Sequence, residues 1–265
     1  MKIKKGFLFL ALAMLVMPFC STAGVIVLEG NYQGKNLYVQ NPFASSGVGF
    51  CVTEVTVNDQ VTTDEIASSA FEIDFANLQL KIGDKVVVKI KHKDDCMPKV
   101  LNEEVLKPKS TFNVVSMSVD KSGLLKWSTT GETGKLTYTV EQFRWNKWVP
   151  VGEVDGIGTS GTNQYSFKIT PHSGKNKFRI KQVDYTGQPR VSQPVEYQSN
   201  IPVVTFTPEK VSKMIEFSDA TMYEIYDQYG NIVKKGFGKE IDATNMPKGV
   251  YYLNYDDKMG NFIKK

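Results

Sequence analysis

The last part of the chain alternates short β-prone runs with turn residues, and this alternation constrains the fold more than any other feature. Between Met222 and Lys265, runs rich in Tyr, Ile and Val are separated by Gly230-Asn231 and by Pro247. Such runs, bounded by Gly, Pro and Asn, are typical of antiparallel strands. Gly supplies the positive φ of a tight hairpin turn. The pattern predicts a small antiparallel sandwich whose role is docking or addressing, since it contains no arrangement typical of an active site.

Four short motifs follow one another in this run: Ile225-Tyr226-Asp227 before Gly230, Ile241-Asp242, Lys248-Gly249-Val250-Tyr251, and the terminal Ile263-Lys264-Lys265. In this order and spacing they resemble the C-terminal sorting domain of proteins exported by the type IX secretion system of Bacteroidota. The resemblance implies that residues from about 206 to 265 engage outer-membrane translocon components, either a barrel or a shuttle protein. The residues it assigns to partner binding are Tyr226, Asp227, Gly230, Asp242, Lys248, Gly249, Val250, Tyr251, Ile263, Lys264 and Lys265.

One segment departs from the pattern of that family. Sorting domains of this kind usually open with a Tyr-Pro-Asn-Pro-like segment, and Phe206-Thr207-Pro208-Glu209 stands in its place. Two roles therefore stay open: cargo carried to the cell surface, or a resident component that retains its sorting domain. The small upstream part, which holds no recognisable catalytic module, favours the resident accessory role in secretion or gliding.

The first 23 residues have the organisation of a secretory signal peptide. Lys2, Lys4 and Lys5 precede an apolar run, and small residues end the segment before Gly24. The apolar run is too short to span a bilayer, which needs about 20 residues. The alternative is a lipoprotein acylated at Cys20, which the bulky Phe preceding it disfavours. We expect a chain exported to the periplasm, outer membrane or cell surface.

Removal of this segment would take three lysines from a chain of net charge +4, leaving about +1. A nearly neutral chain has no electrostatic footprint for nucleic acid. Two cysteines would remain, Cys51 and Cys96. In an oxidising compartment they could form a disulfide, and two buried free thiols are the alternative.

The length favours several small domains, and we expect an all-β protein with three tandem antiparallel β-sandwich (Ig-like) domains. The first covers residues 24–108. In its Lys81–Lys93 run, Val86, Val88 and Ile90 should face a core and Lys89 and Lys91 solvent. Phe71, Ile73 and Phe75 should also face inward. Together with the turn-bounded runs Val52–Val57, Thr62–Asp64 and Ile82–Asp84, this region resembles a carboxypeptidase-regulatory-like sandwich, a family of supporting modules without catalysis of their own.

The second domain is expected at residues 109–198, and the sorting-like domain at 199–265. In the second, Leu125, Trp127, Tyr138 and Val140 alternate with polar residues. These runs, with Trp148–Gly152 and Phe178–Gly187, resemble fibronectin type III-like modules. We expect Trp127 and Trp148 to be buried and to supply much of the apolar core.

No constellation of residues predicts catalysis, a metal or a cofactor. His92 and His172 lie in different predicted domains. The cluster His92–Cys96 offers ligand-type atoms, but nearby lysines would repel a cation, and we expect His92 to be a core or capping residue. The loop Gly156–Gly161 is followed by no helix, so it forms no phosphate cradle. Weak calcium binding by Asp155 and Asn163 is the alternative there.

Six tyrosines crowd the last domain, and strand alternation cannot bury all of them. They are Tyr223, Tyr226, Tyr229, Tyr251, Tyr252 and Tyr255. Those left exposed would suit a protein partner, because Tyr combines buried area with a polar tip. Our first hypothesis is a non-enzymatic exported protein that docks on the type IX translocon. The alternative is a surface adhesin or carbohydrate-binding protein, for which Tyr32, Tyr38 and Phe43 are the few aromatic candidates on the first sandwich.

Overall fold

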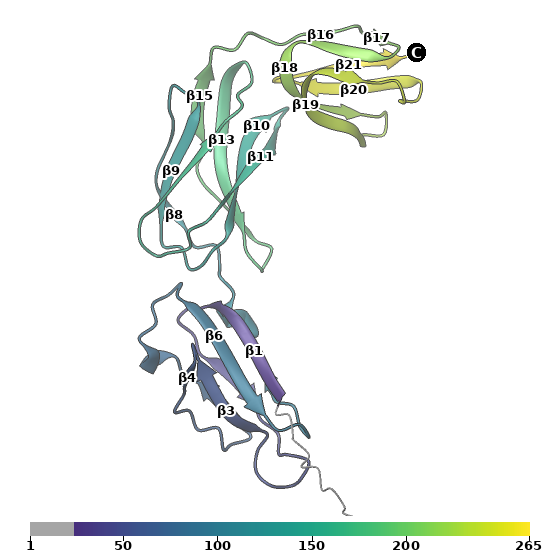
Figure 1. The fold of residues 1–265 in the computed structure, drawn as a ribbon. Coiled ribbons are helices and arrows are strands. Elements are labelled where there is room, and N and C mark those ends of the chain that lie inside the picture. The colour runs from purple at the N-terminus through teal and green to yellow at the C-terminus, as the bar shows by residue number, and fades with distance from the viewer. Residues whose placement is uncertain (1–23) are drawn as a thin grey trace, which may run out of the picture. The chain divides into compact units, whose positions relative to one another are not determined.

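The computed structural model describes residues 24–265, so the predicted signal peptide and Cys20 lie outside the described residues. The regular secondary structure of the described chain is almost entirely β-strand (Figure 1). The helical elements are two 3-10 helices, η1 (Ala76–Leu78) and η2 (Glu103–Leu106). Neither of them approaches the length and apolarity that a membrane-crossing helix needs. The predicted all-β fold class is confirmed.

The sheets take their strands from three consecutive parts of the chain, which we call the N-terminal stretch (residues 24–108), the middle stretch (109–198) and the C-terminal stretch (199–265). By compactness, the described chain divides into two units: residues 24–28, 38–73 and 88–101 form one, and residues 29–37, 74–87 and 102–265 form the other. The middle and C-terminal stretches therefore belong to one unit. The number of domains and their exact boundaries stay predictions.

The N-terminal stretch contains a four-stranded and a three-stranded sheet. The first has the order β1 (Gly24–Asn31), β6 (Lys85–His92), β3 (Val52–Val57), β4 (Gln60–Val61), and the second the order β5 (Ala70–Ile73), β2 (Leu37–Gln40), β7 (Lys99–Val100). The predicted inward residues of β6 and of the Phe71–Phe75 run are buried. Asn58 and Asp59, both with positive φ, form the turn between β3 and β4.

The middle stretch forms two sheets around one apolar core. One sheet has the order β12 (Asn163–Lys168), β9 (Leu124–Thr130), β8 (Asn113–Val119). The other has the order β11 (Lys147–Asp155), β10 (Thr137–Arg144), β13 (Gly174–Val183), β14 (Pro189–Val191), and β15 (Val195–Ser199) also pairs with β13. Leu125, Trp127, Tyr138 and Val140 lie in the core as their alternation predicts. Trp127 stacks on Tyr165 with ring centroids 5.3 Å apart.

The prediction for Trp148 was wrong. Trp148 is only half-buried, and Trp145 is the buried tryptophan of this hairpin. The chain reverses between β10 and β11 at Trp145 and Asn146, which both have positive φ, as a type I′ turn requires. This register pairs Trp148 with Phe143 on the outer face of the sheet. There the guanidinium of Arg179 lies 4.2 Å from the Trp148 ring centroid, so the ring packs under a cation instead of in the core.

The C-terminal stretch is a six-stranded sheet that bends around its own core. The strands are β16 (Phe206–Thr207), β17 (Lys210–Val211), β18 (Met214–Tyr226), β19 (Ile232–Asp242), β20 (Gly249–Tyr255) and β21 (Lys258–Lys264), in the order β16-β18-β20-β21-β17 with β19 also on β18. The pairing of β18 with β19 is interrupted between Glu216 and Thr221. Both reversals predicted from Gly230-Asn231 and from Pro247 are present, because β19 starts at Ile232 and β20 at Gly249.

Candidate functional site

Three apolar side chains gather on the outer face of the C-terminal sheet. Val250 of β20 lies directly opposite Ile263 of β21, and opposite residues of an antiparallel pair point to the same face. Tyr252 lies two residues along β20 and shares that face. Their exposed fractions are 49% for Val250, 52% for Tyr252 and 46% for Ile263. We call these three residues the outer patch; it includes two of the residues assigned by the sorting-domain resemblance.

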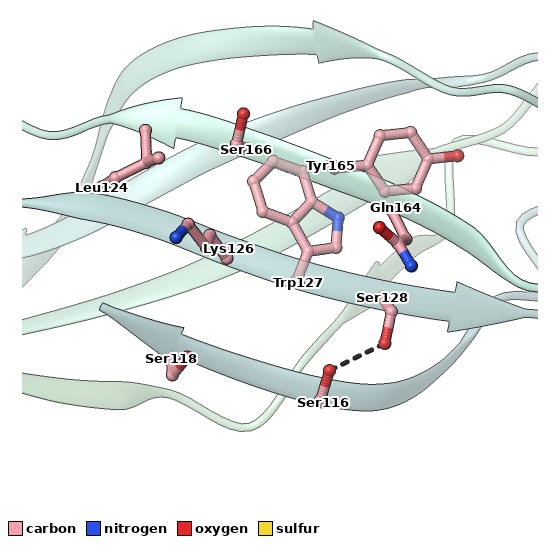
Figure 2. A pocket seen from close by; sticks show the side chains of 9 residues that line it. All are labelled: Ser116, Ser118, Leu124, Lys126, Trp127, Ser128, Gln164, Tyr165 and Ser166. Atoms are coloured by element: carbon pink, nitrogen blue, oxygen red, sulfur yellow. Dashed lines mark hydrogen bonds between the residues drawn. The ribbon is translucent and has the colours of Figure 1, made fainter. Parts of the chain in front are cut away.

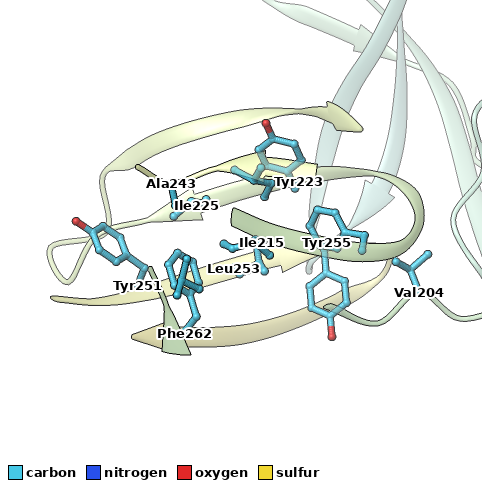
Figure 3. Close-up of a cluster of buried hydrophobic side chains, with 12 residues drawn as sticks. Val204, Ile215, Tyr223, Ile225, Ala243, Tyr251, Leu253, Tyr255 and Phe262 are labelled. Atoms are coloured by element: carbon cyan, nitrogen blue, oxygen red, sulfur yellow. The ribbon is translucent and has the colours of Figure 1, made fainter. Parts of the chain in front are cut away.

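Three of the six tyrosines of the C-terminal stretch lie on the inner face of its sheet. Tyr223, Tyr251 and Tyr255 are buried in the core, where Figure 3 shows them among aliphatic side chains and Phe262. Tyr251 stacks on Phe262 with ring centroids 5.4 Å apart, and its hydroxyl donates to the Pro247 carbonyl at 3.0 Å. The predicted site residue Tyr251 therefore holds β20 and β21 together. It can affect a partner only indirectly, by setting the shape of the sheet.

The predicted acidic residues Asp227 and Asp242 shape turns. The Asp227 carboxylate accepts hydrogen bonds from the backbone N–H groups of Tyr229 and Asn231, both at 2.9 Å. Hydrogen bonds from Asn231 lower the pKa of Asp227. Gly230, with φ +82°, completes this turn. Asp242 accepts from Thr244 N–H at 2.8 Å, and hydrogen bonds from Thr244 lower its pKa. These residues fix the ends of the sheet.

The remaining predicted site residues lie at the ends of β20 and β21. Lys248 and Gly249 are exposed where β20 begins. Lys264 is buried, and its Nζ donates to the carbonyl of Lys265 at 3.1 Å. The Lys265 N–H donates to Val211 at 2.9 Å, in the parallel pairing of β17 with β21. Strand β21 is thus enclosed between β20 and β17. Lys264 is part of this sheet, whereas the side chain of Lys265, just beyond β21, is exposed.

Sequence reasoning missed a polar group on the outer face, next to the outer patch. Lys147, from the middle stretch, donates to Glu224 Oε2 and to the Tyr226 hydroxyl, both at 2.7 Å. Burial acts to lower the pKa of Lys147, but the bonds to Glu224 and Tyr226 outweigh it and raise the pKa. Burial likewise acts to raise the pKa of Glu224, and the bond from Lys147 lowers it overall. The predicted site residue Tyr226 is therefore already engaged within the chain.

The cysteines and the histidine of the N-terminal stretch, Cys51, Cys96 and His92, have structural roles. Cys51 and Cys96 form a disulfide with Cα atoms 5.8 Å apart. His92 is buried, as its position on β6 predicts, and its Nδ1 lies 2.9 Å from the Lys93 carbonyl oxygen. In residues 24–265, no three His, Cys, Asp or Glu side chains are grouped so that they could hold a metal ion.

A broad hollow of about 490 Å³ lies on the sheet β12-β9-β8 of the middle stretch (Figure 2). Its lining is mostly polar: Ser116 and Ser128 share a hydrogen bond at 2.7 Å, and Lys126 lies on the middle strand, β9. Trp127 and Tyr165 form part of its floor but are buried in the core. The hollow therefore offers no exposed aromatic ring on which a sugar could stack.

Comparison with known proteins identifies the C-terminal stretch. Residues 207–265 match the family described as "Secretion system C-terminal sorting domain". The match covers less than a quarter of the chain, and no curated protein matches the chain. The chain is therefore an exported protein with a type IX sorting tail, associated with the cell surface or outer membrane and interacting with the secretion machinery in general.

Several solved structures resemble the chain weakly. A tetra-tandem repeat from the extending region of a large adhesion protein is 10% identical, with a TM-score of 0.32 over 92% of this chain and 75% of that one. Dimeric latent PorU from Porphyromonas gingivalis is 12% identical, with a TM-score of 0.23 over 91% of this chain and 31% of that one. The chicken CNTN1 FN1-FN3 domains are 8% identical, with a TM-score of 0.26 over 90% of this chain and 97% of that one.

Proposed function

We propose that this chain is a non-enzymatic exported protein that docks on the type IX outer-membrane machinery through its C-terminal stretch. It serves there as an accessory component of secretion or gliding, or travels as surface cargo. The observation that supports the proposal is the outer patch, which lies within the matched sorting-domain residues. Clustered exposed apolar side chains mark protein interaction sites.

The composition of the patch suits a protein partner. Tyr252 joins a large apolar ring to a hydroxyl that can keep a hydrogen bond at an interface, and Tyr is enriched at interface centres. Val250 and Ile263 are β-branched and conformationally stiff, so ordering them on binding costs little side-chain entropy. The enclosed terminal strand and the turn-forming Asp227 and Asp242 hold this surface in a fixed shape.

The test is affinity purification of the full chain from the outer membrane of a host that carries the type IX system. The variant Val250→Lys places a charge in the patch, and Val183→Lys is its matched control, because Val183 on the middle stretch is 48% exposed against 49% for Val250. We expect Val250→Lys to reduce recovery of translocon proteins by at least tenfold and the control to leave it unchanged. Equal recovery from both variants and the wild type would overturn the proposal.

The same experiment separates the two roles. Recovery of an intact C-terminal stretch together with a translocon barrel supports a resident accessory component. Release into the medium of a chain that lacks residues near 206–265 supports cargo. The melting curves of both variants, followed by circular dichroism, show whether Val250→Lys acts on docking or on folding.

A further inference from the structure

The turn between β20 and β21 is bonded to the middle stretch through a buried carboxylate. Asp256 is 1% exposed. It accepts from the Ser173 N–H at 2.8 Å and from the Ser173 hydroxyl at 2.5 Å, and from the Val204 N–H at 3.2 Å. A buried carboxylate is stable only where donors replace its water. Two of these three donors belong to the middle stretch.

A buried guanidinium beside it joins the same two parts. Arg144, at the end of β10, is also 1% exposed. It donates to the Asp256 carbonyl at 3.3 Å, to the Thr170 carbonyl at 3.0 Å and to Gln142 Oε1 at 2.7 Å. Burial lowers the pKa of Arg144 to about 10, and the charges of Asp256 and Asp257 oppose this. Each part therefore supplies polar partners that the other needs.

The Lys147 contact with Glu224 and Tyr226 is a second attachment, made by the same β10–β11 hairpin. Its ammonium also lies 5.5 Å from the Tyr226 ring centroid. Tyr226 pairs with Tyr252 across β18 and β20, so this contact adjoins the outer patch on the same face of the sheet. The hairpin thus occupies the end of the face that carries Tyr226.

We propose that the middle stretch is a built-in partner of the sorting domain. Through Arg144, Lys147 and Ser173 it holds the C-terminal stretch in one fixed position and covers Tyr226, so that the secretion machinery contacts the outer patch and leaves the Tyr226 hydroxyl untouched. The part of this inference that concerns the machinery rests on the proposed docking function; the internal attachment does not.

The internal attachment is tested in the full chain by the distance distribution between two spin labels, attached at the exposed positions 153 and 245 through Glu153→Cys and Asn245→Cys. We expect one narrow distribution. The double variant Asp256→Asn with Lys147→Met should broaden it at least twofold, and the control double variant Glu216→Gln with Lys121→Met, at exposed positions of the same two stretches, should not. Asn tolerates the positive φ of residue 256, so the turn itself is kept. A broad distribution in the wild type, or one that the first double variant leaves unchanged, would overturn the attachment.

The docking part is tested with Tyr226→Phe, which removes only the hydroxyl. We expect recovery of translocon proteins to stay within twofold of the wild type, while Val250→Lys loses at least tenfold. A tenfold loss with Tyr226→Phe would show that the machinery reads this hydroxyl and would overturn the inference. If Val250→Lys has no effect while the spin-label distribution is narrow, the proposed function fails and the internal attachment stands.

Discussion

The carboxylate of Glu132 accepts a hydrogen bond from the hydroxyl of Tyr165, whose oxygen lies 2.8 Å from Oε1 and 2.9 Å from Oε2. The Tyr138 hydroxyl donates to the same carboxylate at 2.9 Å, and the Gly158 N–H does so at 2.8 Å. Burial raises the pKa of both tyrosines. This group ties the loop Gly156–Gly161 to the core of the middle stretch, so the loop predicted from its glycines is anchored at Gly158.

Replacement of Glu132 by Ala should destabilise the protein by about 3 kcal/mol, because several buried donors lose their acceptor and each costs about 1–3 kcal/mol, partly relieved by relaxation. Urea unfolding followed by tryptophan fluorescence would measure the change. Glu153→Ala, at an exposed position of β11, should change the free energy of unfolding by less than about 0.5 kcal/mol. Similar values for the two variants would contradict the structural role given to Glu132.

The buried carboxylate of Glu141 should make stability depend on pH. Burial acts to raise its pKa, but hydrogen bonds from Lys181 and Arg179, at 2.5 and 2.6 Å, lower it below 4.5 overall. A carboxyl with a lowered folded-state pKa stabilises the protein above its unfolded-state pKa, and this contribution is lost as the pH falls through the folded-state pKa. We expect the wild type to exceed Glu141→Gln by about 1–2 kcal/mol at pH 7, after allowance for the partly exposed bases.

Unfolding free energies of these two proteins, measured between pH 7 and pH 3, should converge as the pH falls below 4.5. Glu196→Gln is the control, because Glu196 forms an ion pair with Lys175 on the solvent side and should affect stability little. A constant difference between wild type and Glu141→Gln over this range would show that the ionised form is not the one the fold stabilises.

The strands could be predicted because apolar and polar residues alternate along them, and this alternation with a period of two is visible in the sequence. Val86, Val88 and Ile90 are buried where alternation places them, and the Gly230 turn follows from its backbone freedom alone. Which tyrosines of the C-terminal stretch face outward could not be predicted, because only the pairing of strands decides which face packs on the core. Tyr251 and Tyr252 are neighbours in the sequence, but Tyr251 is buried and Tyr252 is exposed.

The polar attachments within the larger unit could not be predicted from sequence for a related reason. Arg144 contacts a residue 112 positions away, and Lys147 one that is 77 positions away. No local pattern marks such pairs. The only local signal is that two cations, Arg144 and Lys147, flank a tight turn. In most hairpins such side chains are solvated. The burial of Trp145 could not be predicted either, because a large ring is uncommon at positive φ.

The disulfide of Cys51 and Cys96 should stabilise the N-terminal stretch. It closes a loop with a sequence separation of 45 residues. Restricting the unfolded chain over such a loop contributes about 3–4 kcal/mol in the chain-entropy model. In the double variant Cys51→Ala with Cys96→Ala, this stretch should unfold at a lower temperature than in the wild type. Hydrogen exchange at the buried amides of β6 should accordingly be faster. Unchanged exchange there in the variant would contradict the prediction, and amides of β18 serve as the internal control.

The turn of the β18–β19 hairpin should depend on the backbone freedom of Gly230. Its φ is +82°, and no atom lies within 4 Å of where a Cβ would be, so only backbone strain opposes a larger residue. Gly230→Ala should therefore cost about 1 kcal/mol, whereas Gly230→Asn should cost less, because Asn adopts positive φ more readily. Gly238→Ala is the matched control, since Gly238 lies on the same hairpin without positive φ and its nearest neighbour would be 3.8 Å from the new Cβ. Thermal unfolding of the three variants would rank them, and a Gly238→Ala loss equal to that of Gly230→Ala would show that the cost arises from lost flexibility of the hairpin and not from the left-handed turn.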